Sequence, residues 1–290
     1  MGTSDHKPAL AALLTVCASA FVAGTTLLAK ALGTGVLGTP LHALQISQGR
    51  FMFAFLIFAC VAVLRRPTIT RPALGLHVGR SALGWGGVTL MFASAAFIPL
   101  SDATAISFLN PVIGMMLAIP FLGERVGPWR IFSAGLALLG AIILMRPGAG
   151  AIQAGALLAV CAAIMMGSEL IFIKLLSRRE KPFQILLINN TIGVILASVA
   201  AYFVWQTATP VQWIALAAIG ALMAAAQTCF VNAMRFADAS FVSPFFYTTL
   251  AFATLYDVIL FNVIPDAISW AGAALILISA AILAWRETRR

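Results

Sequence analysis

Residues Leu13–Leu32, LLTVCASAFVAGTTLLAKAL, are repeated 144 positions later as Leu157–Leu176, LLAVCAAIMMGSELIFIKLL. Seven residues coincide without a gap, among them a cysteine early in each segment and a lysine near its end. A repeat in an apolar chain, with an odd number of helices in each copy, places the two copies in opposite orientations across a bilayer. The match therefore predicts a membrane protein built from an inverted repeat.

The composition independently places the chain in a membrane. Hydrophobic residues make up 62% of the 290 residues and charged residues only 9%, whereas about a quarter of the residues of a soluble protein are charged. A spanning helix needs roughly 20 apolar residues. Such stretches are predicted at 9–32, 41–64, 74–98, 103–121, 128–146, 152–177, 183–205, 211–236, 240–262 and 267–285. No segment alternates with a period of two over ten residues, which argues against a β-barrel.

The repeat continues beyond the first helix. Residues 102–107, DATAIS, match residues 238–243, DASFVS, at an offset of 136. The change of offset falls in the loops, as expected for two diverged copies, so each copy holds five helices. We expect the copies to be residues 1–148 and residues 149–290. The predicted fold is an all-α integral membrane protein with ten transmembrane helices arranged as an inverted 5+5 repeat.

The basic residues predict the orientation. With the N-terminus inside, fifteen of the eighteen fall in cytoplasmic segments: Lys7, Arg65, Arg66, Arg71, Arg80, Arg125, Arg130, Lys174, Arg178, Arg179, Lys181, Arg235, Arg286, Arg289 and Arg290. Only Lys30, Arg50 and Arg146 fall at the other face. This bias predicts a multi-pass protein of the cytoplasmic (inner) membrane with both termini in the cytoplasm. The net charge of +9 follows from that topology, and without an aromatic-interleaved basic run no nucleic-acid partner is expected.

Motifs of several other functions are missing from the sequence. The cysteines lie in apolar helices without CxxC spacing, so we expect no metal and no cofactor. The motifs of an intramembrane enzyme are missing: the sequence has no HExxH, no pair of aspartates on one helix, and no GxSxG with acid and base partners. The sequence has no Walker loop, which a nucleotide-driven pump would need, and no motif of a channel selectivity filter. A secondary carrier is the remaining class.

Several motifs resemble one family of membrane proteins. They are Arg50-Phe51, PLSDATAISFLNPV and FLGERVGPWRIFSAGLALLGAIILMRPG in the first half, and SPFFYTTLAFATL and IPDAISWAGAALILISAAILAWRE in the second. The chain is similar over about residues 10–287 to the EamA family of the drug/metabolite transporter superfamily. The resemblance implies ten helices, an inverted repeat and a central cavity for small organic solutes. The chain departs from the pattern at Asn262-Val263, where the family often has Gly-Glu, and at Phe246, where related members carry Asp.

Glu169 is the most unusual residue among the candidates for a binding site. It lies several residues inside a predicted helix, in AAIMMGSELIFIK. An ionisable side chain at that depth is costly and normally faces a cavity or a partner. A carboxylate that binds an amino group when ionised, and is neutral when empty, would couple proton release to solute binding. The alternative is a helix-packing hydrogen bond or a side chain that reaches the cytoplasmic interface.

The other candidates are polar or aromatic residues within predicted helices. They are Gln227, Tyr247, Phe246, Asn110, Trp85 and Asn232. Buried amides join membrane helices as often as they bind ligands, and aromatic rings often face lipid, so both interpretations stay open for each residue. Asn110-Pro111 interrupts the fourth helix, and the freed carbonyls are tolerated where they line a cavity. A plain kink is the alternative there.

These observations favour a carrier that works by alternating access on a small-molecule substrate, embedded in membrane lipid. Export of an amino acid or an amino-acid derivative is the leading prediction. The alternative is uptake of a larger heteroaromatic metabolite such as S-adenosylmethionine or a vitamin. Proton coupling fits either direction, and we expect a monomer or a weak homodimer.

Overall fold

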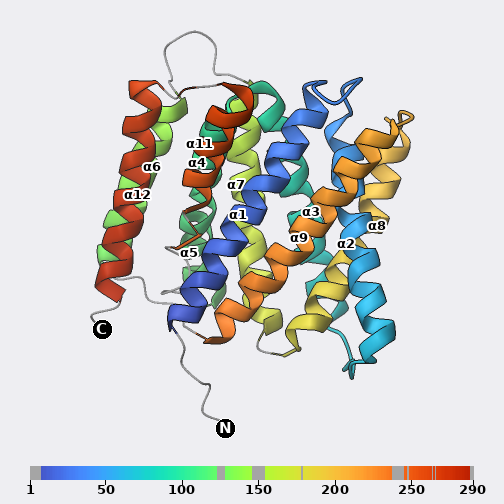
Figure 1. Cartoon of the computed structure of the whole chain (residues 1–290). Helices are drawn as coiled ribbons and strands as arrows, with labels where there is room; N and C mark the ends of the chain where they lie inside the picture. Colours follow the sequence, from blue (N-terminus) through green and yellow to red (C-terminus); the bar gives the residue numbers. More distant parts are fainter. Residues whose placement is uncertain are drawn as a thin grey trace.

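The protein is described by a computed structural model that covers residues 8–122, 128–145, 154–177, 179–236, 245–246, 248–262, 264 and 266–287. Its elements are helices: α1 Pro8–Gly33, α2 Ala43–Arg65, α3 Leu74–Phe97, α4 Leu100–Ser107, α5 Leu109–Leu122, α6 Pro128–Met145, α7 Ala154–Ser177, α8 Pro182–Tyr202, α9 Pro210–Phe236, α11 Thr248–Phe261 and α12 Ala267–Glu287. Each predicted stretch coincides with one or two of these helices (Figure 1). Five of the described helices, α1, α2, α7, α8 and α9, are long and apolar enough to cross a membrane.

The fourth predicted helix is broken into α4 and α5 at Phe108. Pro111 has no N–H to donate to the carbonyl four residues earlier, that of Ser107, so the α-helical ladder fails there. The Phe108 N–H bonds instead to Thr104 O at 3.3 Å and to Ala105 O at 3.1 Å, which tightens the last turn of α4. The interruption predicted at Asn110-Pro111 is therefore present, one turn earlier than the proline itself.

The helix contacts have the symmetry of an inverted repeat. Helix α1 packs on α9, and its repeat partner α7 packs on α3. Likewise α1 packs on α11 and α7 on α5, while α2 packs on α9 and α8 on α3. The pairs α2–α8 and α6–α12 are their own counterparts, and they form opposite edges of the bundle in Figure 1. Exchanging the two halves leaves this set of contacts unchanged.

Hydrogen bonds fix the relative direction of the helices. Ser94, near the end of α3, donates to Gly155 O at the start of α7 at 2.8 Å, and His77 at the start of α3 contacts Glu180 just after α7. Helices α3 and α7 are therefore antiparallel. Gly33 at the end of α1 lies against the end of α3, so α1 is parallel to α3 and opposite to α7. The two copies run in opposite directions, as the inverted repeat requires.

One buried glutamine closes each end of the α2–α8 pair. Gln45 in α2 donates to Gln206 O at 2.7 Å and accepts from Gln206 N at 3.1 Å. Gln184 in α8 donates to Thr70 O at 3.1 Å and accepts from Thr70 N at 2.8 Å. Each side chain thus satisfies two backbone groups of the loop that follows the other helix. We call these two groups of contacts the Gln45 clamp and the Gln184 clamp.

Candidate functional site

A polar stripe runs along α3, with one residue at every fourth position: His77, Ser81, Trp85 and Thr89. Residues spaced by four lie on one face of a helix, and this face meets α2 and α8. Thr89 donates to the Ser47 hydroxyl of α2 at 2.8 Å. Ser81 donates to Asn189 Oδ1 of α8 at 3.1 Å. Polar contacts therefore extend from one end of α3 deep into the bundle.

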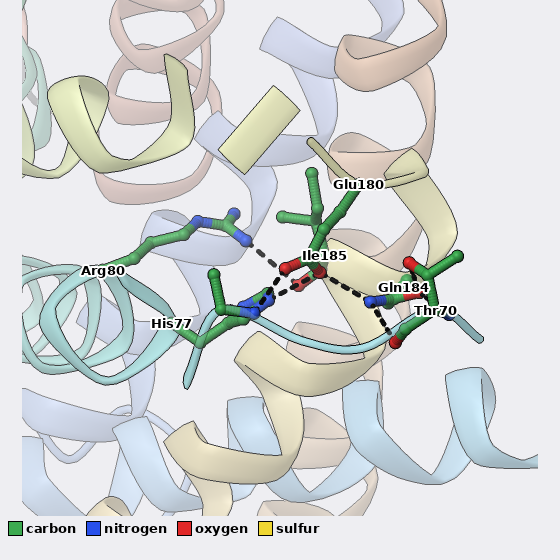
Figure 2. A network of polar contacts seen from close by, with 7 residues as sticks. Thr70, His77, Arg80, Glu180, Gln184 and Ile185 are labelled. Atoms are coloured by element: carbon green, nitrogen blue, oxygen red, sulfur yellow. Dashed lines mark hydrogen bonds and ion pairs between the residues drawn. The ribbon is translucent and has the colours of Figure 1, made fainter. Parts of the chain in front are cut away.

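An ion pair joins α3 to α7 beside this stripe. Arg80 Nε lies 3.3 Å from Glu169 Oε1, and the two side chains are 6% and 16% exposed. Arg80 Nη1 also donates to Ile185 O of α8 at 3.1 Å (Figure 2). The carboxylate has room because Gly84 faces it, since a Cβ at that position would lie 2.9 Å from the carboxylate oxygens. Glu169 is therefore a partly buried ion-pair partner of Arg80.

Arg50 of α2 belongs to the same charged cluster. It is 4% exposed, and it interacts electrostatically with both Glu169, which attracts it, and Arg80, which repels it. Its guanidinium lies over the ring of Phe51, 4.1 Å from the centroid. Its Nε and Nη1 have no hydrogen-bond partner among the described residues. With Glu169 ionised, the Arg50–Arg80–Glu169 cluster carries one net positive charge.

The first turn of α3 carries a second network of hydrogen bonds, shown in Figure 2. Glu180 accepts from Ala73 N at 2.8 Å, contacts His77 Nε2 at 2.8 Å and accepts from Gln184 at 2.7 Å. Burial raises the pKa of Glu180, but these hydrogen bonds and the attraction to His77 outweigh it and hold that pKa below its usual 4.5. Glu180 thus connects the Gln184 clamp to the first turn of α3.

A separate ion pair lies on the other side of the bundle. Lys30 Nζ of α1 is 2.7 Å from Asp257 Oδ1 of α11, and the lysine ammonium also lies 4.4 Å from the centre of the Phe261 ring. Both residues are buried. The pair ties together helices of the two halves, and its matched charges give it a structural role.

Glu169 and Trp85 are the predicted site residues that the structure brings to the α3 region. Glu169 forms the ion pair with Arg80, and Trp85 belongs to the polar stripe. The Trp85 indole Nε1 is buried and has no hydrogen-bond partner among the described residues. Tyr247, a further candidate, lies outside the described residues.

The contacts described for the remaining candidates are with residues outside the cluster. Gln227 accepts from Asn190 Nδ2 of α8 at 3.1 Å, which is a helix-packing contact. Phe246 packs edge-on against Phe230, with ring centres 5.3 Å apart. Asn110 lies in the first turn of α5, and its backbone carbonyl faces Gly167 of α7 at close range.

Asn232 borders a cavity of about 510 Å³ between α2, α8 and α9. Its amide donates to Thr228 O in its own helix at 2.8 Å. The cavity is lined mostly by apolar side chains, with Arg65 and Lys181 among its lining residues. Lys181 also donates to Thr68 at 2.8 Å. The cavity therefore lies near the end of α2, away from the buried cluster.

Sequence reasoning missed both arginines of the cluster. It assigned Arg80 to the inner face and Arg50 to the outer face, but the structure buries them at 5% and 4% exposure. Arg80 is held inside by its ion pair with Glu169 and by the hydrogen bond from its Nη1 to the Ile185 carbonyl, both from the second half of the chain. The sequence did carry one signal: residues spaced by four from His77 to Thr89 mark a polar face of α3, and Arg80 lies next to Ser81 of that face.

The described residues contain no group of three or more His, Cys, Asp or Glu side chains that could hold a metal ion. The chemistry of the cluster is instead that of hydrogen bonding and charge. Two guanidinium groups and an indole N–H can donate hydrogen bonds to acceptor oxygens, and the carboxylate can accept from an ammonium group or hold a proton. Groups of this kind can bind the polar parts of a small organic molecule.

The sequence profile of the EamA-like transporter family matches residues 9–146 and 153–285, so the chain belongs to that family. The chain is 34% identical to a riboflavin transporter of Rhizobium johnstonii over 74% of its own length and 71% of the relative. It is 24% identical to an S-adenosylmethionine uptake transporter of Rickettsia bellii over 87% of each chain. A crystal structure with 19% identity superposes with a TM-score of 0.68 over 96% of this chain and 98% of the other, which supports the fold.

The protein is therefore a transporter embedded in a membrane, and the expectation that it is not an enzyme agrees with its family. Its fold is the all-α, ten-helix inverted repeat predicted from the sequence. The family match falls into two segments, one in each predicted half of the chain. The boundary predicted at residues 148 and 149 lies outside the described residues.

Proposed function

We propose that the protein is a secondary carrier that takes up a planar heteroaromatic metabolite across the cytoplasmic membrane, with riboflavin as the first candidate. The observation that carries this proposal is the Arg50–Arg80–Glu169 cluster, in which two buried arginines of α2 and α3 in one half interact with Glu169 of α7 in the other. Charged side chains inside a membrane protein mark solute pathways. Inverted-repeat carriers bind their solute where the repeats meet.

The choice of substrate is supported by the relatives and by the donors of the cluster. One relative is named a riboflavin transporter and another an S-adenosylmethionine uptake transporter, and both names denote substrates with a heteroaromatic ring. Trp85, whose indole Nε1 is buried, provides an N–H donor and an aromatic edge within the polar stripe.

Export of an amino acid or its derivative is the second candidate function. The observation that favours it is the presence of both charges in one cluster, because Glu169 fits an ammonium group and an arginine fits a carboxylate. Riboflavin has no ammonium group for Glu169. The two proposals therefore differ in one respect: binding of a zwitterionic solute should depend on the charge of Glu169.

Proton coupling through Glu169 is part of the proposal for either solute. A carboxyl that is protonated in one conformation and paired with Arg80 in the other would transfer one proton in each cycle. A carrier with this property transports faster when a proton gradient of the right sign is imposed. We infer that Glu169 provides this coupling.

Counterflow with purified protein in liposomes tests the proposal. Vesicles loaded with unlabelled riboflavin should accumulate labelled external riboflavin transiently, because a carrier exchanges solute through one alternating site. Vesicles loaded with an unlabelled amino-acid mixture and given labelled amino acid provide the comparison. Accumulation of amino acids and not of riboflavin would favour the second candidate function, and simple equilibration without overshoot would contradict a carrier.

The orientation is proposed from the distribution of basic residues, with both termini in the cytoplasm of a cell whose inner membrane holds the protein. Ser4→Cys and Thr288→Cys, each in a background without the native cysteines, test it in intact cells. Neither cysteine should react with an impermeant maleimide until the membrane is opened. Rapid labelling of either position in sealed cells would contradict the orientation.

A further inference from the structure

Arg50 lies in the bundle with donors that no described residue accepts. It is 4% exposed, and its Nε and Nη1 find no hydrogen-bond partner in the described part of the chain. An unpaired donor in a dry interior keeps the full cost of its desolvation, and a charged one costs more. Native proteins retain such groups rarely, so each one calls for an explanation.

Helix geometry places a second unpaired donor at the same depth. Ser47 of α2 and Thr89 of α3 are joined by a hydrogen bond of 2.8 Å. Arg50 lies about one turn beyond Ser47, and Trp85 about one turn before Thr89, on helices joined by a short connection. The Trp85 indole Nε1 is also buried and without a partner among the described residues. Three donor atoms of Arg50 and Trp85 therefore lie at this level of the bundle. Arg80 Nε also lacks a hydrogen bond among the described residues, but it faces the Glu169 carboxylate at 3.3 Å.

The surrounding charges leave Arg50 uncompensated. Glu169 attracts it, but that carboxylate already pairs with Arg80, and Arg80 repels Arg50. Gln48 Oε1 is also without a partner, yet Gln48 precedes Arg50 by two positions on the same helix, and residues at that spacing do not face each other. The ring of Phe51 covers one face of the guanidinium and leaves its edge for hydrogen bonding.

We propose that Arg50 is a substrate-binding residue that, together with Trp85, donates hydrogen bonds to a planar pair of acceptor oxygens on the transported solute. This inference rests on the transport function proposed above and names the part of the solute that is recognised. The planar guanidinium matches two acceptors side by side. A carboxylate presents such a pair directly, whereas the two carbonyl oxygens of a flavin ring flank a ring N–H, so that Arg50 would meet one flavin oxygen and Trp85 the other.

The burial of these donors is consistent with a carrier that closes around its binding site. The unpaired Arg50 and Trp85 atoms are shut off from solvent in the described conformation. A solute reaches them when α2, α3 and α7 separate, and it then replaces the missing partners. Binding of the solute thus stabilises a conformation in which a buried charge is satisfied, which is how a ligand shifts a conformational equilibrium.

The test combines stability and binding in the purified full-length protein, with Arg50→Gln, Arg50→Lys and, as a matched control, Arg71→Gln in the exposed loop before α3. The melting temperature is measured first without ligand. Riboflavin binding is then measured by quenching of flavin fluorescence, and phenylalanine binding by thermal shift, so that the dione and carboxylate sources are separated. Arg71→Gln should match the wild type in all three measurements.

The proposal predicts that Arg50→Gln melts at or above the wild-type temperature, because it removes an unsatisfied buried charge, and binds its ligand at least tenfold more weakly. Arg50→Lys should also bind at least tenfold more weakly, because an ammonium lacks the planar fork. A lower melting temperature for Arg50→Gln would assign the residue to folding and overturn the proposal, as would wild-type affinity. Binding of phenylalanine but not riboflavin to the wild type would refute the flavin substrate while leaving Arg50 as the acceptor-binding residue. The ligand-free melting temperature decides the inference even where neither probe binds.

Discussion

The α3–α7 contact and the α1–α9 contact occupy equivalent places in the inverted repeat, yet their chemistry differs. The α1–α9 contact is neutral in the described residues, with Ala11 packed against Ala233 and Gly24 against Leu222. Thr25 of α1, the repeat counterpart of Glu169, donates its hydroxyl to Val22 O of its own helix. The α3–α7 contact contains Glu169 paired with Arg80.

The same difference is found at the ends of the bundle. In the first turn of α9, Gln212 holds Thr39 O through a neutral amide at 2.8 Å. In the first turn of α3, His77 contacts the carboxylate of Glu180. Symmetry therefore provides the scaffold, and Glu169 and Glu180 lie where the two copies have diverged, whereas Lys30, the partner of Asp257, has a lysine at the equivalent position of the second copy. We infer that the solute chemistry of the carrier depends on the divergent copy of the contact.

The largest effect on stability is expected from Arg80→Gln. Removing Arg80 takes away the direct ion-pair partner of the partly buried Glu169 carboxylate and leaves Arg50 as the remaining cation near it, which costs about 3 kcal/mol. The melting temperature of the purified protein should fall clearly. Thr25→Val in the equivalent α1 position should change it little, because the Thr25 hydroxyl bonds within its own helix. Equal losses in the two variants would contradict the difference between the contacts.

Glu180→Gln should lower stability by about 2 kcal/mol at neutral pH, because charge-assisted hydrogen bonds are lost. The pKa of Glu180 is held below 4.5 in the folded protein, so its stabilising contribution is present above the unfolded pKa and is lost as pH falls through the folded value. The difference between wild type and variant should therefore shrink below about pH 4.5. Melting curves from pH 7 to pH 3 measure it, with Gln212→Glu as a variant that transfers a carboxyl to the neutral end. A difference that does not vary with pH would rule out this role for the carboxylate.

Gly84 in the α3–α7 contact and Gly24 in the α1–α9 contact differ in the space around them. A Cβ on Gly84 would lie 2.9 Å from the Glu169 carboxylate, whereas a Cβ on Gly24 would lie at an ordinary 3.4 Å from Leu222. Gly84→Ala should push the carboxylate away from Arg80 and cost about 1–2 kcal/mol, as overpacking does. Gly24→Ala should be neutral or slightly stabilising, because alanine favours the helix. Thermal melts of the two variants side by side are sufficient, and a larger loss at Gly24 would reverse the prediction.

The smallest difference is expected between the two glutamine clamps. Gln45 and Gln184 each make a reciprocal pair of backbone hydrogen bonds, so Gln45→Ala and Gln184→Ala should each cost about 1 kcal/mol. Gln184 also donates to Glu180, and its variant should therefore lose slightly more at neutral pH. The losses should converge at acid pH, where Glu180 is protonated. If one of the two alanine variants had the stability of the wild type, the two ends of the α2–α8 pair would not be equivalent.

The helices and the inverted repeat were predictable because they depend on local composition and on motifs repeated along the chain. Apolar runs of spanning length and the matched cysteines are visible without knowledge of contacts. The break at Pro111 was predictable for the same reason, since a missing N–H acts within one turn.

The arginines of the cluster were not predictable in the same way. A basic residue within about two turns of a helix end is usually assigned to the interface. The burial of Arg80 depends on a carboxylate from the other half of the chain and on the space left by Gly84. Glu169 was identified from its depth alone, but its partner follows only from the packing of α3 on α7.

The most direct test of the central claim compares Glu169→Gln with Thr25→Val in riboflavin counterflow under an imposed proton gradient. These residues are repeat counterparts, and both substitutions preserve side-chain shape. We predict that Thr25→Val transports within about twofold of the wild type and keeps its pH response, while Glu169→Gln folds but loses the pH response and at least tenfold of the rate, which corresponds to about 1.4 kcal/mol. Unchanged rate and pH response in Glu169→Gln would contradict the account and reduce the α3–α7 ion pair to a packing contact.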